Sequence, residues 1–121
     1  MVDPLVMVKF RGLVSTFHAA NGALADAERR RNSAIQARSA LQAERTRLGL
    51  IRYATPVAEA DHQSALARLD AEIAKAEAEV AALTAEHERL EGRRDDANAN
   101  ASRARDFLME RFGLARSALE Y

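Results

Sequence analysis

The sequence contains no cysteine and no tryptophan, and only two prolines, two lysines and six aromatic residues among 121 positions. Without cysteine, neither a disulfide nor a thiolate metal site can form. Six aromatic residues are few for a globular core, because large side chains supply most of the apolar area that offsets the entropy of the ordered chain. Alanine, glutamate, arginine and leucine are abundant instead, and all four favour helices. We therefore expect an all-α protein built from long helices.

The sequence also lacks a long apolar run. Its first residues, Met1–Pro4, carry no basic segment, and the short run Leu5–Val8 is followed at once by Lys9. Such a run is too short for the core of a signal peptide and far too short to cross a bilayer. We expect no signal peptide, no transmembrane segment and no membrane partner, and a location inside the cell or inside a particle.

The two prolines predict where helices begin. Asp3 and Thr55 are good N-cap residues, and each is followed by proline, which is tolerated at the first helical position. Gly113 is a natural residue with which to end the second helix. Short connections join antiparallel helices, so the chain should fold back on itself. The prediction is a single helical-hairpin domain over residues 1–121, with helix one at about 3–52, a turn at 53–55, helix two at about 56–112 and a C-terminal tail at 113–121.

Heptad spacing predicts that the two helices form a long antiparallel coiled coil. Helix two repeats the 3-4 spacing over about six heptads. The positions are Leu66, Leu69, Ile73, Ala76, Val80, Leu83, His87, Leu90, Arg94, Ala97, Ala101, Ala104 and Leu108. Helix one has two columns of seven-residue spacing. One contains Leu13, Ala20, Ala27, Ala34, Leu41 and Leu48, and the other contains Phe10, Phe17, Leu24, Arg31, Arg38, Arg45 and Arg52.

Opposite charges on the two halves of the chain predict how the helices align. Residues 1–56 carry nine Lys/Arg against four Asp/Glu, whereas residues 57–121 carry nine against fourteen. A turn at 53–55 would place residue i beside residue 107 − i to 110 − i. Arg31 would then face Glu79, and Arg38 would face Glu72. We expect these four charges to set the register of the hairpin rather than to add much stability.

Bulky apolar residues gather near both ends of the sequence, which an antiparallel hairpin brings together. The predicted interface residues are Leu5, Phe10, Leu13, Phe17, Phe107, Leu108 and Phe112. A pair of helices cannot bury so wide an apolar surface alone, and exposed patches of this kind mark interfaces. The alternative is a small local core that closes the base of the hairpin. Near the turn, Arg47 and His62 suggest a solvated tip with little to bury.

A second hypothesis concerns nucleic acid. The cluster Arg29–Arg31, continued by Arg38, Arg45 and Arg52, could follow a phosphate backbone. The competing interpretation is pairing of these cations with the acidic second helix, which would cancel most of their field. The net charge of zero favours pairing within the chain.

No pattern of residues predicts catalysis, a cofactor or a small-molecule substrate. There is no glycine-rich phosphate loop and no nucleophile motif, and a two-helix hairpin offers no ligand-sized cleft. The run Asp96–Asn100 matches the start of an EF-hand loop, but Ala101 stands where that loop needs glycine and Phe107 where it needs glutamate. His87 and Glu91 have the spacing of two metal ligands but no third ligand nearby. We expect no metal, and a register-setting role for His87.

The heptads, the hairpin and the apolar base together predict a structural protein and not an enzyme. The pattern is similar to that of small coiled-coil hairpins in secretion stalks and viral structural components. That resemblance implies a helical-hairpin subunit that oligomerises, or docks with other protein subunits, inside a larger particle. A nucleic-acid-associated packaging or regulatory module that uses the arginine-rich first helix is the alternative.

Overall fold

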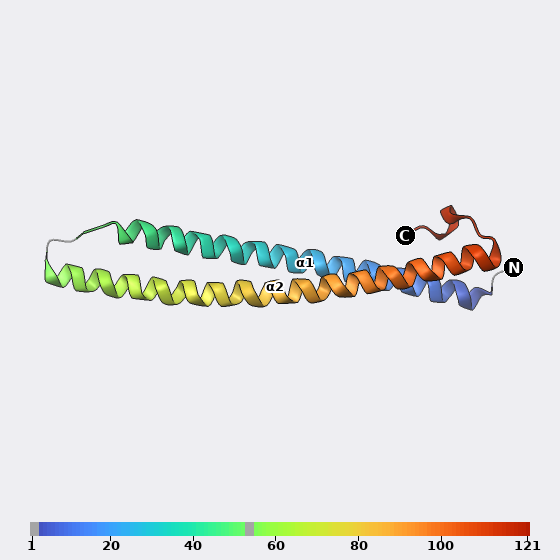
Figure 1. Ribbon diagram of the computed structural model, residues 1–121, viewed down its shortest axis with the longest axis horizontal. Coiled ribbons are helices and arrows are strands. Elements are labelled where there is room, and N and C mark those ends of the chain that lie inside the picture. Colours follow the sequence, from blue (N-terminus) through green and yellow to red (C-terminus); the bar gives the residue numbers. More distant parts are fainter. Residues whose placement is uncertain (1–2, 53–54) are drawn as a thin grey trace. The chain divides into compact units, whose positions relative to one another are not determined.

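Two long helices account for most of the chain. The computed structural model describes residues 3–52 and 55–121. Helix α1 covers Pro4–Gly49, helix α2 covers Pro56–Phe112, and a short 3-10 helix, η1, covers Arg116–Leu119 (Figure 1). The two long helices pack against each other, and the described residues contain no strand. The predicted all-α helical hairpin is confirmed.

Both long helices begin at the predicted caps. The Asp3 Oδ1 atom accepts a hydrogen bond of 2.9 Å from the Leu5 amide, and the Thr55 hydroxyl accepts one of 3.1 Å from the Ala58 amide. Each bond satisfies one of the amides that a helix N-terminus leaves without a partner. Helix α2 ends as predicted at Phe112, because Gly113 adopts φ = +66° and its amide donates to the Met109 carbonyl. A left-handed residue at this position stops a helix.

Helix α1 ends three residues before the predicted position, at Gly49 rather than at about residue 52. The amides of Leu50 and Ile51 donate to carbonyls three residues earlier, which tightens the last turn. The Arg52 guanidinium then donates to the Gly49 carbonyl at 2.8 Å. These bonds satisfy carbonyls that another helical turn would have used. Of the predicted turn at 53–55, residues 53 and 54 lie outside the described residues.

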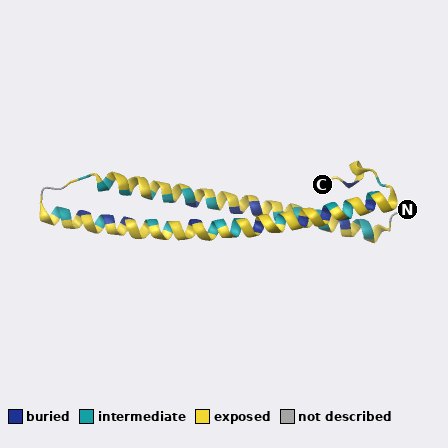
Figure 2. Cartoon of the chain, in the orientation of Figure 1, coloured by how far each residue is buried: buried dark blue, intermediate teal, exposed yellow. Residues whose placement is uncertain are grey.

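The chain divides into two compact units, and both helices contribute to each. The base unit combines Met1–Ala27 with His87–Tyr121, and the turn unit is Glu28–Glu86. Throughout both units, the residues that face the other helix follow the predicted columns. Every column residue within α1 and α2 is buried or half-buried, as the dark blue and teal segments of Figure 2 show. Only Arg52, which lies beyond the end of α1, is exposed.

The base unit contains the larger side chains of the core. Phe10, Leu108 and Leu119 form one buried cluster, and Leu24, Ala27 and Leu90 form a second. The turn unit buries fewer residues than the base unit does. Its buried residues are Ala34, His62, Leu66, Leu69 and Val80.

In the turn unit, the register differs from the prediction by about one heptad. Arg30 pairs with Glu86 and Arg45 with Asp70, so the numbers of facing residues add up to 116 and 115 rather than 107–110. Residues 50–52 leave the helix, and α2 begins beyond the last turn of α1 instead of directly opposite it, so each α1 residue faces a later residue of α2 than predicted (Figure 1).

Candidate interaction surfaces

The seven predicted interface residues separate into a buried group and an exposed group. Phe10 and Leu108 are buried, and Leu13 and Phe17 are half-buried. Leu5, Phe107 and Phe112 are exposed. The base of the hairpin is therefore partly closed by a core of its own, and only part of the predicted surface is open to a partner.

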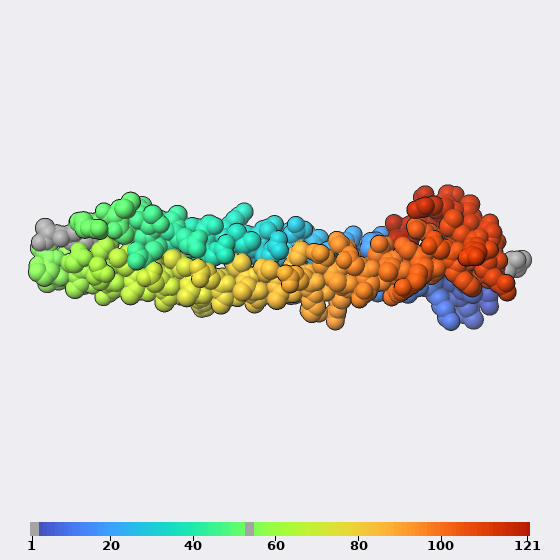
Figure 3. All heavy atoms as spheres, in the orientation of Figure 1, coloured from blue at the N-terminus to red at the C-terminus, as the bar shows by residue number. Residues whose placement is uncertain are grey.

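The C-terminal tail closes this core. Leu119, on η1, is fully buried against Phe10 and Leu108. The ring of Tyr121 stands edge-on to the rings of Phe10 and Phe17, with centroids 6.3 and 5.5 Å away. Figure 3 shows the tail, in red, lying against the end of α2 instead of extending from it. The local core considered as an alternative is thus present, and the tail contributes Leu114, Leu119 and Tyr121 to it.

Polar contacts fix the Tyr121 side chain. Its hydroxyl lies 2.7 Å from the Ser102 hydroxyl and donates to the Asn98 amide oxygen at 3.2 Å. The Arg105 guanidinium lies over the ring, 5.4 Å from its centroid, which is within the range of a cation–π contact. One signal of this arrangement is visible in the sequence, namely two large apolar residues, Leu119 and Tyr121, beyond the end of the second helix.

Four large apolar side chains among the described residues of the base unit remain exposed. Leu5 and Val8 lie on the first two turns of α1, with 69% and 62% of their surface exposed. Phe107 and Phe112 lie on the last two turns of α2, with 54% and 36% exposed. The centroids of the two phenylalanine rings are 6.2 Å apart, and the rings are in a T-shaped arrangement. A hollow of about 440 Å³ lies beside Phe107, Glu110 and Arg111. We call these four residues the base surface.

The turn end is less polar than predicted. Leu50 and Val57 are 77% and 74% exposed, whereas His62, expected at a solvated tip, is buried. Apolar residues flank Arg52 and Thr55 in the sequence and could have indicated this exposure. The prediction of a polar tip was based instead on the charged residues nearby. Among the described residues, the turn end therefore exposes two large aliphatic side chains, against two aliphatic and two aromatic side chains in the base surface.

The predicted ion pairs, Arg31 with Glu79 and Arg38 with Glu72, do not form; other ion pairs join the helices instead. Ion pairs between the helices include Arg30–Glu86 at 3.2 Å and Arg45–Asp70 at 2.8 Å. The shift of register described above explains the change. Arg31 and Arg38 lie half-buried between the helices, each with a buried Nε that has no hydrogen-bond partner, while Glu72 and Glu79 are exposed.

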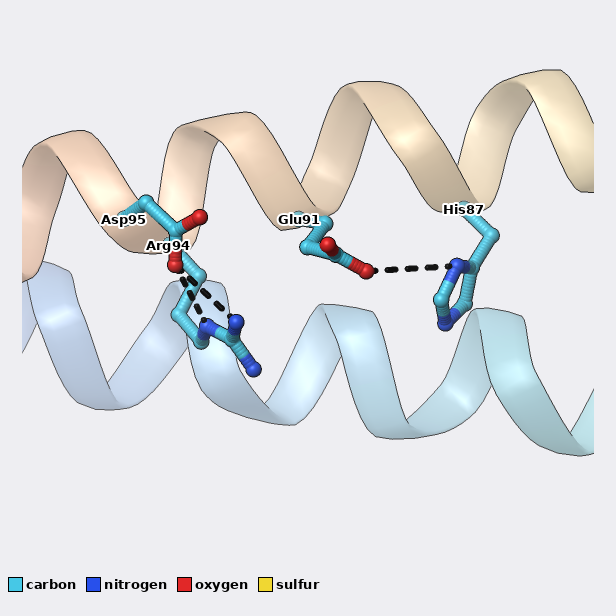
Figure 4. A network of polar contacts seen from close by, with 4 residues as sticks. All are labelled: His87, Glu91, Arg94 and Asp95. Atoms are coloured by element: carbon cyan, nitrogen blue, oxygen red, sulfur yellow. Dashed lines mark hydrogen bonds and ion pairs between the residues drawn. The ribbon is translucent and has the colours of Figure 1, made fainter.

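Polar side chains also occupy column positions in the base unit. His87 and Arg94 reach from α2 toward α1 in Figure 4. The His87 Nδ1 atom lies 3.8 Å from a Glu91 carboxylate oxygen, and Arg94 donates to the Asp95 carboxylate at 2.9 Å. Each acidic partner comes from α2 itself, so these contacts orient side chains along one helix. A register-setting role for His87 remains a prediction.

The EF-hand-like run forms part of α2 rather than a loop. The side-chain oxygens of Asn98 and Asn100 accept hydrogen bonds from Tyr121 and Arg103. In the described parts of the chain, no three histidine or acidic side chains are grouped as metal ligands would be. Among the described residues, neither long helix contains an apolar stretch that could span a bilayer.

Comparisons with family models, with curated proteins and with solved structures gave no match.

Proposed function

We propose that the chain is a structural interaction subunit, a helical hairpin that docks into a larger protein assembly through the base surface. The observation that supports this most directly is the exposure of Phe107 and Phe112, whose rings pack on each other but not into the core. Aromatic side chains contribute most to interface energetics, and soluble chains seldom leave them open without a partner. The assignment is to an interaction protein and not to an enzyme.

The base surface is a better docking site than the turn end. Both ends expose apolar groups; within the described residues, those at the turn end are aliphatic, whereas the base presents two aromatic rings beside a hollow. The core formed by Phe10, Leu108 and Leu119 also holds the first turns of α1 and the last turns of α2, so the base surface is presented on an ordered support. A docking surface that is ordered before binding loses less entropy when a partner arrives.

The ion pairs count against the alternative of nucleic-acid binding. Arg30 and Arg45 are already neutralised by carboxylates of α2, and the Arg52 guanidinium donates to backbone carbonyls. Of the remaining basic cluster, Arg31 and Arg38 are half-buried between the helices.

We propose that the chain functions in a multi-subunit particle inside the cell, or in a virion. This follows from the resemblance of its heptads to those of secretion-stalk and viral hairpins.

Two double variants test the proposal with matched chemistry. F107S/F112S removes the aromatic part of the base surface, and L50S/V57S removes the exposed apolar residues of the turn end. An affinity-tagged chain is expressed in its native cells, and the size of the recovered complex is measured by light scattering. We expect the base variant to lose the assembly, the turn variant to keep it, and both to retain wild-type helix content by circular dichroism. Assembly that depends on Leu50 and Val57 instead would overturn the proposal.

A further inference from the structure

Glu72 and Glu79, which do not pair with α1 as predicted, belong to a stripe of four charges on α2. The stripe is Arg68, Glu72, Lys75 and Glu79, with spacings of four, three and four residues that place all four on one helical face. All are exposed. Among the described residues, none of the four has an ion pair or a side-chain hydrogen bond, not even with its neighbour one turn away.

The order of these charges makes the stripe complementary to itself. Along α2 the signs alternate as plus, minus, plus, minus, so the same stripe in the opposite direction presents minus, plus, minus, plus. An antiparallel second copy would place Arg68 against Glu79 and Glu72 against Lys75. The two-fold axis repeats both pairs, which gives four ion pairs between the copies. This is the pattern of an isologous interface, in which one patch pairs with itself.

Charge alone would not hold two copies together, because an exposed ion pair contributes little. An apolar groove beside the stripe supplies a place where a second helix can approach closely. It has a volume of about 540 Å³ and lies between α1 and α2 in the turn unit. Its lining comprises Arg29, Arg30, Ser33, Ala34, Ala37, Glu79 and Leu83. Leu83 is only half-buried in the single chain, so covering the groove would bury more of it.

Neighbouring residues fit the same alignment and limit its extent. The next positions along the stripe are Ala65 and Ala82, which would face each other across the two-fold axis and allow close contact. One step further, Asp61 would face Glu86, a repulsive pair. Glu86 is already paired with Arg30 within its own chain, and its repulsion of Asp61 would end the interface at that point. The self-complementary part thus extends over residues 65–82 of α2.

We propose that two copies of this chain associate side by side through residues 65–82 of α2, in antiparallel orientation. The partner is a second copy rather than an unrelated protein, because one stripe carries both the unpaired cations and the carboxylates that match them. This contact is separate from the base surface and does not rest on the docking proposed above. Together, the two surfaces would give the subunit two separate contacts in an assembly.

Two charge variants and their mixture test the proposal. E72R/E79R makes the stripe wholly basic, and R68E/K75E makes it wholly acidic. We expect the wild-type chain to dimerise in sedimentation equilibrium, with a dissociation constant that rises with salt. Each variant alone should raise that constant at least about tenfold, since four attractive pairs become repulsive. An equimolar mixture should form the mixed dimer, observed by native mass spectrometry, with affinity near that of the wild type.

The controls separate this proposal from the docking surface. F107S/F112S should dimerise as the wild type does, and circular dichroism should show that all variants keep their helices. A wild-type chain that stays monomeric at millimolar concentration would overturn the proposal. So would a mixture that gives no mixed dimer, or variants that dimerise as well alone as the wild type does. None of these outcomes depends on whether the base variant loses its larger assembly.

Discussion

Tyr121 stands edge-on to Phe10, although the two residues lie at opposite ends of the sequence. Their ring planes meet at 72°, and Leu119 fills the space beside Phe10 and Leu108. The tail is therefore part of the fold and not an appendage, because it completes the core of the base unit.

Leu119→Ala tests the contribution of the tail to stability. Removing a fully buried leucine side chain should lower the free energy of unfolding by about 2–5 kcal/mol. Ser117→Ala, at an exposed position of the same 3-10 helix, should change it by less than about 0.5 kcal/mol. Urea denaturation followed by circular dichroism measures both. Equal effects of the two variants would show that the tail is not packed as described.

Phe10 and Phe112 should respond differently to the same substitution. Phe10→Ala empties a buried site and should cost about 3–5 kcal/mol of stability. Phe112→Ala removes a ring that keeps 36% of its surface exposed and lies outside the buried clusters, so the cost should stay below about 1.5 kcal/mol, mainly from the ring pair with Phe107. Thermal unfolding distinguishes them. If Phe112→Ala destabilises the monomer as much as Phe10→Ala, the ring belongs to the core and not to a docking surface.

The helix columns could be predicted because the information for them is local. Proline after an N-cap residue, glycine at the end of α2 and the seven-residue repeats each act within a few turns of one helix. The register could not be predicted in the same way. It depends on whether residues 50–52 continue the helix, and their last-turn hydrogen bonds and the Arg52 contacts prevent that.

The base illustrates a second limit of the sequence. Phe10, Phe107, Leu108 and Phe112 could be recognised as a group of apolar residues at one end. Which of them are buried depends on the tail, and the tail has no periodicity from which its path could be predicted. Its direction is set by the left-handed Gly113 and by the Tyr121 hydrogen bonds, which join residues far apart in the sequence.

Two glycines should give opposite effects when changed to alanine. Gly113→Ala forces a Cβ atom into the left-handed region at φ = +66°, which should cost about 1–2 kcal/mol. Gly92 lies within α2, and a Cβ there would meet nothing within 4 Å. Gly92→Ala should therefore stabilise the chain by about 0.5–1 kcal/mol. Melting temperatures of the two variants should move in opposite directions, and a shift of the same sign would contradict the described end of α2.

The start of α2 depends on Thr55. Thr55→Ala removes the hydrogen bond from the Ala58 amide and should cost about 1 kcal/mol. Thr46 is the control, because its hydroxyl donates to the Gln42 carbonyl within α1 at 3.0 Å and caps no helix end. Thr46→Ala should be neutral or slightly stabilising. Hydrogen exchange at residues 57–59 should increase only in the Thr55 variant; an unchanged exchange rate there would argue against the cap.

Hydroxyl-radical footprinting of the free chain and of the recovered assembly tests the central claim most directly. Mass spectrometry then gives the oxidation of Phe107 and Phe112 in the base surface and of Leu50 and Val57 at the turn end, all exposed in the single chain. The docking account predicts that oxidation of the two phenylalanines falls several-fold on assembly while that of Leu50 and Val57 does not change. Protection of Leu50 and Val57, with Phe107 and Phe112 oxidised as in the free chain, would contradict it.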